Sequence, residues 1–358
     1  MLSARAAVRS LKKYHPPLSG RTGLRLDFNE NTQGASPRVL ARLRELTLEE
    51  LARYPEREPV ERQVAEFLGV SPAEVLLTNG VDEGIHLLCQ TFLQEGDEAV
   101  LVVPTFAMYE LLAGSAGAKV IAVPAARNFE FPTDGVIAEI TERTRLVAVA
   151  NPNNPTGAVA TRERLLRVAE AAPQAAVLVD EAYFEFYGES MLRDVRDVAN
   201  LFVARTFSKA YGLAGLRIGV LAGCEQQMQM VRKVASPYNV NGVALSCLPA
   251  AMEDQQYVSS YVAEVVKGRE RLQRALEGLG IRYWPSRGNF VLAAFGEHAR
   301  QVVTALGRRG ILVRDRSSDP GCAGCVRMTV GNEKQMDELL VALEGTVREI
   351  GMGEKVGP

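Results

Sequence analysis

The sequence predicts an α/β fold, with a mostly parallel sheet in a large domain and a smaller α+β domain after it. Between about residues 60 and 235, short apolar or β-branched runs alternate with longer amphipathic stretches, which is the pattern of βα units. After about residue 260 the pattern changes to a long helical stretch, short strands and a final helix. The chain has 358 residues, which exceeds one ordinary domain, so we expect two.

The first part contains five expected strands, at residues 75–78, 99–103, 146–150, 176–179 and 201–204. Each of them ends against polar residues, glycine or proline. In open α/β sheets, ligands bind beyond the carboxyl ends of the strands. The residues that follow these strands are therefore the candidates for a functional site.

The second part contains expected strands at residues 290–295, 311–314 and 326–330. A final helix is indicated by the helical spacing of its apolar residues, which are Met336, Leu339, Leu340 and Leu343. The N-terminal residues are rich in Pro, Gly and Asn, and we expect them to pack on the smaller domain. The predicted bounds are 1–45 for this segment, 46–255 for the large domain and 256–358 for the small domain.

The composition is that of a soluble globular protein, with 47% hydrophobic and 23% charged residues. A net charge of -2 gives no global electrostatic reason to expect nucleic acid or an anionic membrane as a partner. The sequence has no run of about 18 apolar residues, and its N-terminus has no apolar stretch long enough for a signal sequence. We therefore expect a cytoplasmic protein that does not span a membrane.

Cysteine and histidine give little indication of a metal or redox site. The five cysteines are an odd number spread along the chain, unlike a disulfide framework. Cys322 and Cys325 form a single CxxC motif, but no second pair and no nearby histidine accompany it. The three histidines stand far apart, so we expect no metal centre.

Lys209 follows one of the expected strands, and its amine is the candidate catalytic group. A lysine amine forms an imine with an aldehyde when desolvation or a nearby positive charge lowers its pKa. An isolated lysine is normally a solvated surface residue, but this one has unusual neighbours. Thr206 and Ser208 supply hydroxyl donors and Arg217 supplies a guanidinium, so together they would hold a phosphate beside the lysine.

A second candidate phosphate element is the segment 78–84, where a strand stops at a glycine and an amphipathic helix begins. The backbone amides of Gly80 and Val81 at that helix N-terminus would point at an anion. The alternative is an ordinary helix cap formed by Asp82. The loop lacks the Walker lysine and the GxGxxG pattern, so neither a nucleoside triphosphate nor a dinucleotide is indicated.

Three further strand ends carry residues that suit an aromatic cofactor. Asp180 ends an apolar strand and can pair with a protonated pyridine nitrogen, although magnesium binding or helix capping are alternatives. Asn154 lies in a turn rich in proline and can donate from its amide to a ring oxygen or a carboxylate. Phe106 could stack on the ring face, although a core role is the alternative.

Together these residues resemble the fold-type I, class II aminotransferases that depend on pyridoxal 5'-phosphate, and within that family the histidinol-phosphate aminotransferase branch. The resemblance covers nearly the whole chain. Further segments that carry it are 26–31, 53–55, 236–240, 288–290, 310–315 and 326–331. It implies a large domain with a seven-stranded, mostly parallel sheet between helices.

The resemblance also implies a role for each site residue. Lys209 is the catalytic lysine that forms the Schiff base, Asp180 pairs with the pyridine nitrogen, and Tyr183 and Asn154 hold the ring hydroxyl. Phe106 stacks on the ring, and Tyr54 reaches the cofactor phosphate of the neighbouring subunit in a homodimer. The cofactor-phosphate positions are Gly80, Val81, Asp82, Thr206, Ser208 and Arg217.

For the substrate, the resemblance implies that Arg327 binds the α-carboxylate and that Arg314, assisted by Tyr14, binds a substrate phosphate. Asn154 is a further substrate-binding position. The sequence departs from the family pattern at Val81, where a small or hydroxyl residue is common. It departs again at 31–34, which read Asn-Thr-Gln-Gly instead of the commoner Asn-Pro-Tyr-Gly.

The implied reaction is amino transfer between glutamate and imidazole acetol phosphate, which gives 2-oxoglutarate and histidinol phosphate in histidine biosynthesis. Ping-pong kinetics are expected, since the amino group is first left on the cofactor. Two enzymes of the same fold stay open as alternatives: an aromatic amino acid aminotransferase and a decarboxylase of the threonine-phosphate type. A cofactor-binding regulator is disfavoured, because the N-terminal 40 residues are too short and too rich in Pro and Gly for a DNA-binding domain.

Overall fold

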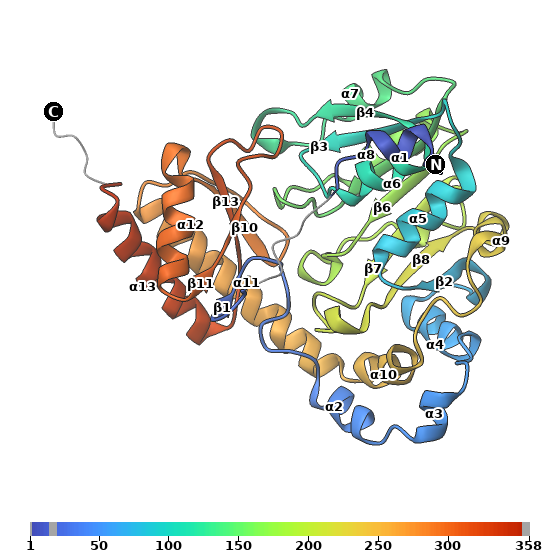
Figure 1. Cartoon of the computed structure of the whole chain (residues 1–358), viewed down its shortest axis with the longest axis horizontal. Coiled ribbons are helices and arrows are strands. Elements are labelled where there is room, and N and C mark those ends of the chain that lie inside the picture. The colour runs from blue at the N-terminus through green and yellow to red at the C-terminus, as the bar shows by residue number, and fades with distance from the viewer. Residues whose placement is uncertain (1, 14–19, 353–358) are drawn as a thin grey trace.

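The computed structural model describes residues 2–13 and 20–352. Its larger sheet has seven strands in the order β2-β8-β7-β6-β5-β3-β4 (Figure 1). Their bounds are β2 Val75–Thr78, β3 Glu98–Val103, β4 Lys119–Pro124, β5 Thr144–Ala150, β6 Ala176–Asp180, β7 Leu201–Thr206 and β8 Gly219–Gly223. The neighbours from β7 to β4 are parallel, whereas β8 is antiparallel to both β7 and β2.

Helices cover both faces of this sheet, which explains why its strands read as continuous apolar runs. On one face, Leu178 and Phe202 pack with residues of α5, α6 and α9. On the other face, Val177 and Val203 pack with residues of α4, α8 and α10. The helix bounds are α4 Glu58–Leu68, α5 Val81–Phe92, α6 Met108–Ala116, α7 Thr133–Ala138, α8 Arg162–Ala171, α9 Glu225–Val234 and α10 Gly242–Glu253.

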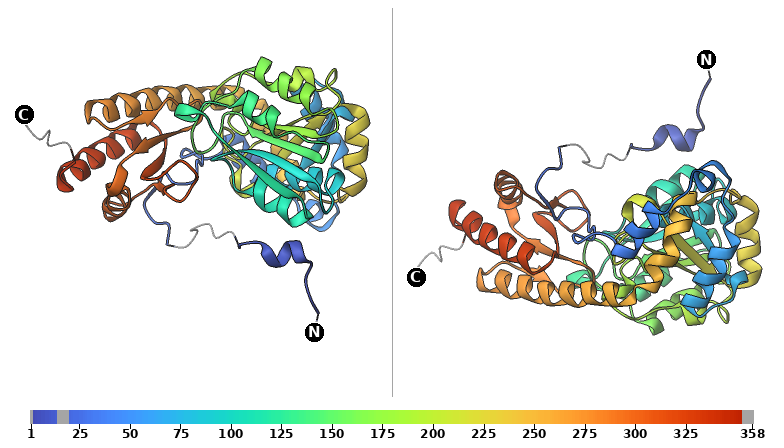
Figure 2. Two further views of the ribbon diagram at one scale, coloured as in Figure 1. Left: turned by 90° about the horizontal axis from the view of Figure 1, so that it is seen from above. Right: turned by 90° about the horizontal axis from the view of Figure 1, so that it is seen from below.

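The second part of the molecule has a four-stranded antiparallel sheet in the order β12-β13-β10-β9. The bounds are β9 Tyr283–Trp284, β10 Phe290–Ala294, β12 Arg314–Asp315 and β13 Cys325–Thr329, with helices α11 Gln255–Gly278, α12 Ala299–Arg308 and α13 Glu333–Glu349. Figure 2 shows that α11 runs from the side of the large sheet along the second part. Met336, Leu339 and Leu343 of α13 are buried, as the apolar spacing predicts.

The predicted fold class is confirmed, but three details of the strand predictions differ. The expected single strand at 311–314 is wrong, since β11 Ile311–Leu312 and β12 Arg314–Asp315 join different sheets. The chain passes from one sheet to the other at Val313. The strands β4 and β8 were not predicted, because β4 is an edge strand with exposed positions and β8 has glycine at both ends.

The N-terminal segment contacts both parts. β1, Leu24–Arg25, pairs in parallel with β11. By contrast α2, Pro37–Arg44, packs on α10, and α1, Ala6–Ser10, contacts α6. The remaining helix of this region is α3, Leu48–Ala52. The predicted domain bounds therefore stay a prediction. Among the described residues, none of the helices combines the length and apolarity that crossing a membrane requires.

Candidate active site

Lys209 lies just beyond the carboxyl end of β7, between the two parts of the molecule. Its Nζ donates to the carbonyl of Phe28 at 3.2 Å and lies 5.9 Å from the centre of the Tyr183 ring. Burial is the main cause that lowers the pKa of Lys209 to about 8, and the positive charge of Arg327 adds to it. The side chain thus meets the two conditions that make a lysine amine nucleophilic near neutral pH.

Asp180 is the last residue of β6, and its carboxylate is buried. The Tyr109 hydroxyl donates to Oδ2 at 2.6 Å, and the Ala182 amide donates to Oδ1 at 3.0 Å. Burial raises the pKa of Asp180 to about 6, against the opposing effect of these two hydrogen bonds. A buried carboxylate without a cationic partner costs free energy, so this site favours a positively charged group.

Tyr183 and Asn154 each form a hydrogen bond with a residue that is distant in the sequence. The Tyr183 hydroxyl accepts from Asn29 Nδ2 at 2.9 Å. The Asn154 Oδ1 accepts from Arg327 Nη1, and Arg327 Nη2 donates to the Asp27 carbonyl at 2.6 Å. Because the Asn154 oxygen already accepts a hydrogen bond from Arg327, the Nδ2 group of the same amide stays available to donate to a ligand.

Arg327 and Arg314 are directly opposite each other in the antiparallel pair of β13 and β12. Arg327 is only 5% exposed, and its buried Nε meets no hydrogen-bond partner within the described residues. Burial is the main cause that lowers the pKa of Arg327 to about 10, and the positive charges of Arg316 and Arg314 add to it, whereas Tyr183 acts in the opposite direction. Like charges at directly opposite positions destabilise a sheet. The pair therefore forms a site that an anion would stabilise.

The candidate phosphate site lies at the N-terminus of α5 beside Arg217. Gly80 has φ +77°, which favours glycine, and a Cβ added there would lie 2.5 Å from Arg217 Nη2, so a larger residue would move the guanidinium. Arg217 Nη2 also lies 3.2 Å from Asp82 Oδ2. No side chain caps α5, so the alternative of Asp82 as a helix cap is wrong. The Gly80 amide donates to the Thr78 carbonyl at 2.8 Å, so the turn already occupies it.

The other predicted phosphate residues lie near this terminus or on the loop after β7. Val81 is the first residue of α5 and is buried. Thr206 and Ser208 are buried too, and the Ser208 amide donates to Thr206 Oγ1 at 3.1 Å. That bond leaves the hydroxyl hydrogen of Thr206 available for a phosphate oxygen.

The remaining predicted residues differ in where they lie. The ring of Phe106 is partly exposed and meets Tyr109 edge-on, with centroids 5.7 Å apart. Tyr54 is 77% exposed and stacks on Tyr238 with centroids 4.4 Å apart. Tyr14 lies outside the described residues.

Three residues of the site were not among the predicted ones, namely Phe28, Asn29 and Tyr109. Tyr109 lies three residues after Phe106, at the start of α6, and that helical spacing was a usable signal. The ring of Phe28 has the guanidiniums of Arg21 and Arg314 at 4.2 and 5.3 Å from its centre. Cation–π contact therefore helps to place Arg314.

The departure at residues 31–34 lies close to the lysine. Asn31 Nδ2 donates to the carbonyl of Ala210, which follows Lys209. Asn31 Oδ1 accepts from the amides of Gln33 and Gly34 at 2.9 and 3.1 Å. The Asn side chain thus closes this loop by itself, without the proline that is common in the family.

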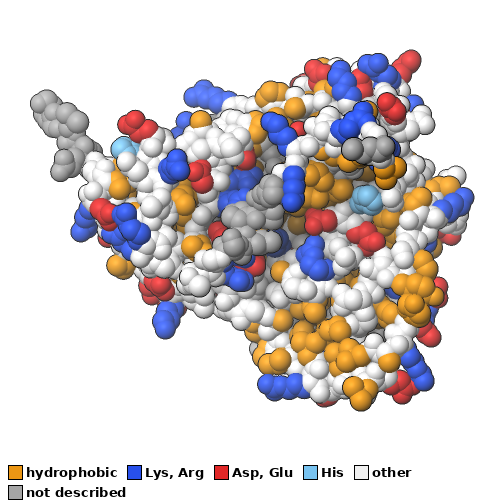
Figure 3. All heavy atoms as spheres, in the orientation of Figure 1, with side chains coloured by type: hydrophobic (Ala, Val, Ile, Leu, Met, Phe, Trp, Pro, Cys, Tyr) orange, Lys and Arg blue, Asp and Glu red, His pale blue; other side chains and the backbone are white. Residues whose placement is uncertain are grey.

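The fold and the site together define an enzyme class in which a lysine amine and a buried acid act at the edge of a parallel sheet. Figure 3 shows Lys and Arg side chains gathered near the middle of the molecule, where its two parts meet. The chain belongs to the family of class I and II aminotransferases, whose model matches residues 21–343. The predicted family is thereby confirmed.

Several curated relatives share one name. The histidinol-phosphate aminotransferase of Roseiflexus castenholzii is 38% identical, over 95% of this chain and 97% of its own length. That of Thermococcus gammatolerans is 35% identical, over 98% of both chains. The solved structure of the Sinorhizobium meliloti histidinol-phosphate aminotransferase, in complex with pyridoxal 5'-phosphate, matches with a TM-score of 0.89 and 27% identity. It covers 96% of this chain and 97% of its own.

Proposed function

We propose that this aminotransferase uses pyridoxal 5'-phosphate to transfer an amino group between glutamate and imidazole acetol phosphate, as a histidinol-phosphate aminotransferase. The observation that carries the proposal is the opposed pair Arg314 and Arg327 beside Lys209. A reaction in which both substrates are anions needs such a pair. The relatives that share the chain's full length and bear this enzyme name support it.

The residues present fit the cofactor. Gly80 leaves the space beside Arg217 that a phosphate needs, and the buried Asp180 suits a protonated ring nitrogen. We assign Tyr183 and Asn154 to the ring hydroxyl and Phe106 to the ring face. We assign the phosphate to Val81, Thr206, Ser208 and Arg217, with Gly80 providing the space and Asp82 acting indirectly through Arg217, with which its carboxylate pairs. When bound, pyridoxal 5'-phosphate supplies an electron-accepting ring that stabilises negative charge at the substrate α-carbon.

Lys209 is the general base and acid of the proposed reaction. Because its pKa is lowered to about 8, a substantial fraction of its amine is neutral near physiological pH and can accept a proton. With the cofactor bound, Lys209 would accept the proton from the substrate α-carbon as a base and donate it again as an acid. The Phe28 carbonyl, 3.2 Å from Nζ, holds the amine in position when no substrate is present.

Arg327 and Arg314 bind the two substrates in turn. Arg327 is fixed by Asn154 and the Asp27 carbonyl, so we assign it to the α-carboxylate of glutamate. Arg314 is partly exposed and held only loosely against Phe28, so we assign it to the phosphate of the larger substrate. A planar guanidinium can bind either a carboxylate or a phosphate through two hydrogen bonds, which suits a site that must accept both.

We further propose a homodimer in which Tyr54 reaches the cofactor phosphate of the neighbouring subunit. Exposed hydrophobic side chains gather over α2, α3 and α10 (Figure 3). They include Leu40, Leu48, Leu51, Tyr54 and Tyr238. Exposed apolar surface of this kind marks an association site. A cytoplasmic location stays a prediction from the sequence.

A panel of amino acceptors, each tested with glutamate as donor, examines the proposal. We expect the highest kcat/KM with imidazole acetol phosphate, and 2-oxoglutarate formed in equal amount to histidinol phosphate. A higher kcat/KM with phenylpyruvate would replace the proposal with the aromatic enzyme. Release of carbon dioxide without 2-oxoglutarate would replace it with the decarboxylase.

A further inference from the structure

β2 lies at one edge of the seven-stranded sheet and leads directly into Thr78–Gly80, the loop that precedes α5. One side of β2 pairs with β8. Within residues 2–13 and 20–352, no strand pairs with the outward backbone groups on its other side, and buried backbone groups need a partner. The position of the loop therefore depends on what holds this outer side.

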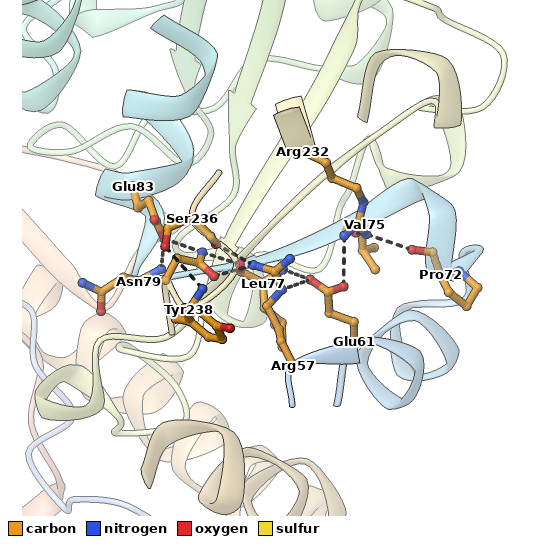
Figure 4. Close-up of polar contacts among 11 residues, drawn as sticks. Arg57, Glu61, Pro72, Val75, Leu77, Asn79, Glu83, Arg232, Ser236 and Tyr238 are labelled. Carbon is orange, nitrogen blue, oxygen red and sulfur yellow. Dashed lines mark hydrogen bonds and ion pairs between the residues drawn. The ribbon is translucent and has the colours of Figure 1, made fainter. Parts of the chain in front are cut away.

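Side chains take the place of the missing strand, as Figure 4 shows in part. The Leu77 amide donates to Glu61 Oε1 at 2.9 Å. The Leu77 carbonyl accepts from Asn239 Nδ2 at 2.9 Å. The Val75 carbonyl accepts from Arg232 Nη2. Three successive outward groups of the strand are thus fixed by side chains from three different segments.

Asn239 is the member of this set that also reaches the loop. Its Nδ2 donates to Glu83 Oε2 at 2.8 Å, and the same oxygen accepts from the Asn79 amide at 2.5 Å. Its Oδ1 accepts from Arg57 Nη1. Arg57 Nε lies 2.9 Å from Oε1 of Glu61, a carboxylate that is 2% exposed. A continuous chain of contacts therefore runs from a buried ion pair to the Asn79 amide.

The same asparagine is also tied to the segment that carries Tyr54. Tyr238, which precedes Asn239, stacks on Tyr54 with centroids 4.4 Å apart. Arg57, three residues after Tyr54, donates to the Ser236 carbonyl at 3.3 Å as well as to Asn239. Two segments that we assign to the cofactor phosphate are thus held through one side chain.

We infer that Asn239 is a positioning residue for the cofactor phosphate. Without contacting the phosphate, it fixes Thr78–Gly80, and with it the N-terminus of α5 beside Arg217. The inference rests on the proposed function, since it assumes that this helix terminus binds the phosphate. Its consequence is specific: loss of Asn239 weakens binding of the phosphate more than binding of the rest of the cofactor.

The test compares the dissociation constants of pyridoxal 5'-phosphate and of pyridoxal, which lacks the phosphate, by absorbance titration of the full chain after cofactor removal. Asn239→Leu preserves the charge and the branching at Cγ, adds volume, and removes the three hydrogen bonds of the amide. We expect the dissociation constant of pyridoxal 5'-phosphate to rise about tenfold and that of pyridoxal to change less than about twofold. Asn239→Ser provides the same comparison if the leucine variant does not fold.

Gln229→Leu is the matched control. Gln229 is exposed on α9, and its amide donates to Glu225 Oε1 at 3.3 Å, a contact within the same helix. Wild-type affinities are expected for this variant. An Asn239 variant that binds pyridoxal 5'-phosphate as wild type does, or that loses both compounds equally, overturns the positioning role. A wild-type chain that binds neither compound overturns the proposed function and this inference with it.

Discussion

At the scale of single residues, Lys209 owes its reactivity to its surroundings. Its pKa of about 8 results first from burial and then from Arg327. The neutral amine is the form that attacks an aldehyde, and a lowered pKa makes this form available at lower pH. The hydrogen bond to the Phe28 carbonyl does not remove this ability, since the nitrogen lone pair stays free when the amine donates.

We therefore predict that the rate constant for binding pyridoxal 5'-phosphate to the cofactor-free protein rises with pH and levels off above about pH 8. The direction follows because deprotonation creates the nucleophile. Stopped-flow absorbance measures this rate constant between about pH 6 and about pH 10, a range that brackets the pKa. A rate that is still rising at the upper end, as for an ordinary solvated lysine, would contradict the burial argument.

Arg314→Ala should reduce kcat/KM for the phosphorylated substrate by roughly ten- to a hundredfold, since hydrogen bonds to charged groups are lost. The loss with glutamate should be smaller, because Arg327 keeps its own partners. Steady-state kinetics with each substrate measure the difference. Arg282→Ala is the control, as that guanidinium lies over Trp284, 5.0 Å from the ring centre. Equal losses with both substrates would remove the phosphate role of Arg314.

Candidate site residues at or just beyond the end of a strand, such as Asp180 and Lys209, could be predicted from the sequence. It did not allow prediction of their partners. Tyr109 and Asp180 are 71 residues apart, and Asn29 and Tyr183 are 154 residues apart. Such pairs are set by how the whole chain folds, which local patterns do not encode.

At the scale of secondary structure, the turn into α5 depends on Gly80. Its φ of +77° with ψ of 172° belongs to a region that side chains other than glycine avoid. Buried strands were predicted well because their apolar runs are long and uninterrupted. The edge strand β4 and the glycine-bounded β8 were not, since partial exposure and glycine both weaken the pattern.

Gly80→Ala should weaken binding of pyridoxal 5'-phosphate at least about tenfold and reduce the free energy of unfolding by about 1–3 kcal/mol. The added methyl group would displace Arg217, whose Nη2 lies 2.5 Å from the new Cβ position. Gly188→Ala separates the two effects, because Gly188 has φ +90° but no atom within 4 Å of its added Cβ. We expect thermal unfolding to show that the Gly188→Ala control is less stable than the wild type. Its affinity for the cofactor should stay unchanged.

At the scale of the whole molecule, the exposed position of Tyr54 is compatible with the contact that we propose with a second subunit. Within one chain it is 77% exposed and stacked on Tyr238. Local sequence pattern does not indicate a contact between subunits, so the prediction for Tyr54 comes from the family resemblance alone. The assembly is therefore best examined by combining defects in different subunits.

Hybrid dimers of a Lys209→Ala subunit and a Tyr54→Ala subunit should regain activity that neither parent homodimer has. If Tyr54 acts on the neighbouring subunit, one site of each hybrid receives both defects and the other receives none. We expect the Lys209→Ala homodimer to retain its circular dichroism spectrum but lose turnover and the visible absorbance of lysine-bound cofactor. Hybrids without activity would show that Tyr54 serves its own subunit.

The side chains that occupy the outer edge of β2 have a consequence for the protein in a crowded solution. An open sheet edge recruits strands from other molecules and so seeds aggregation. Here Glu61, Asn239 and Arg232 already bond the groups that a foreign strand would need. The residues that position the loop before α5 thus also end the sheet, and variants that free this edge should be more prone to polymerise.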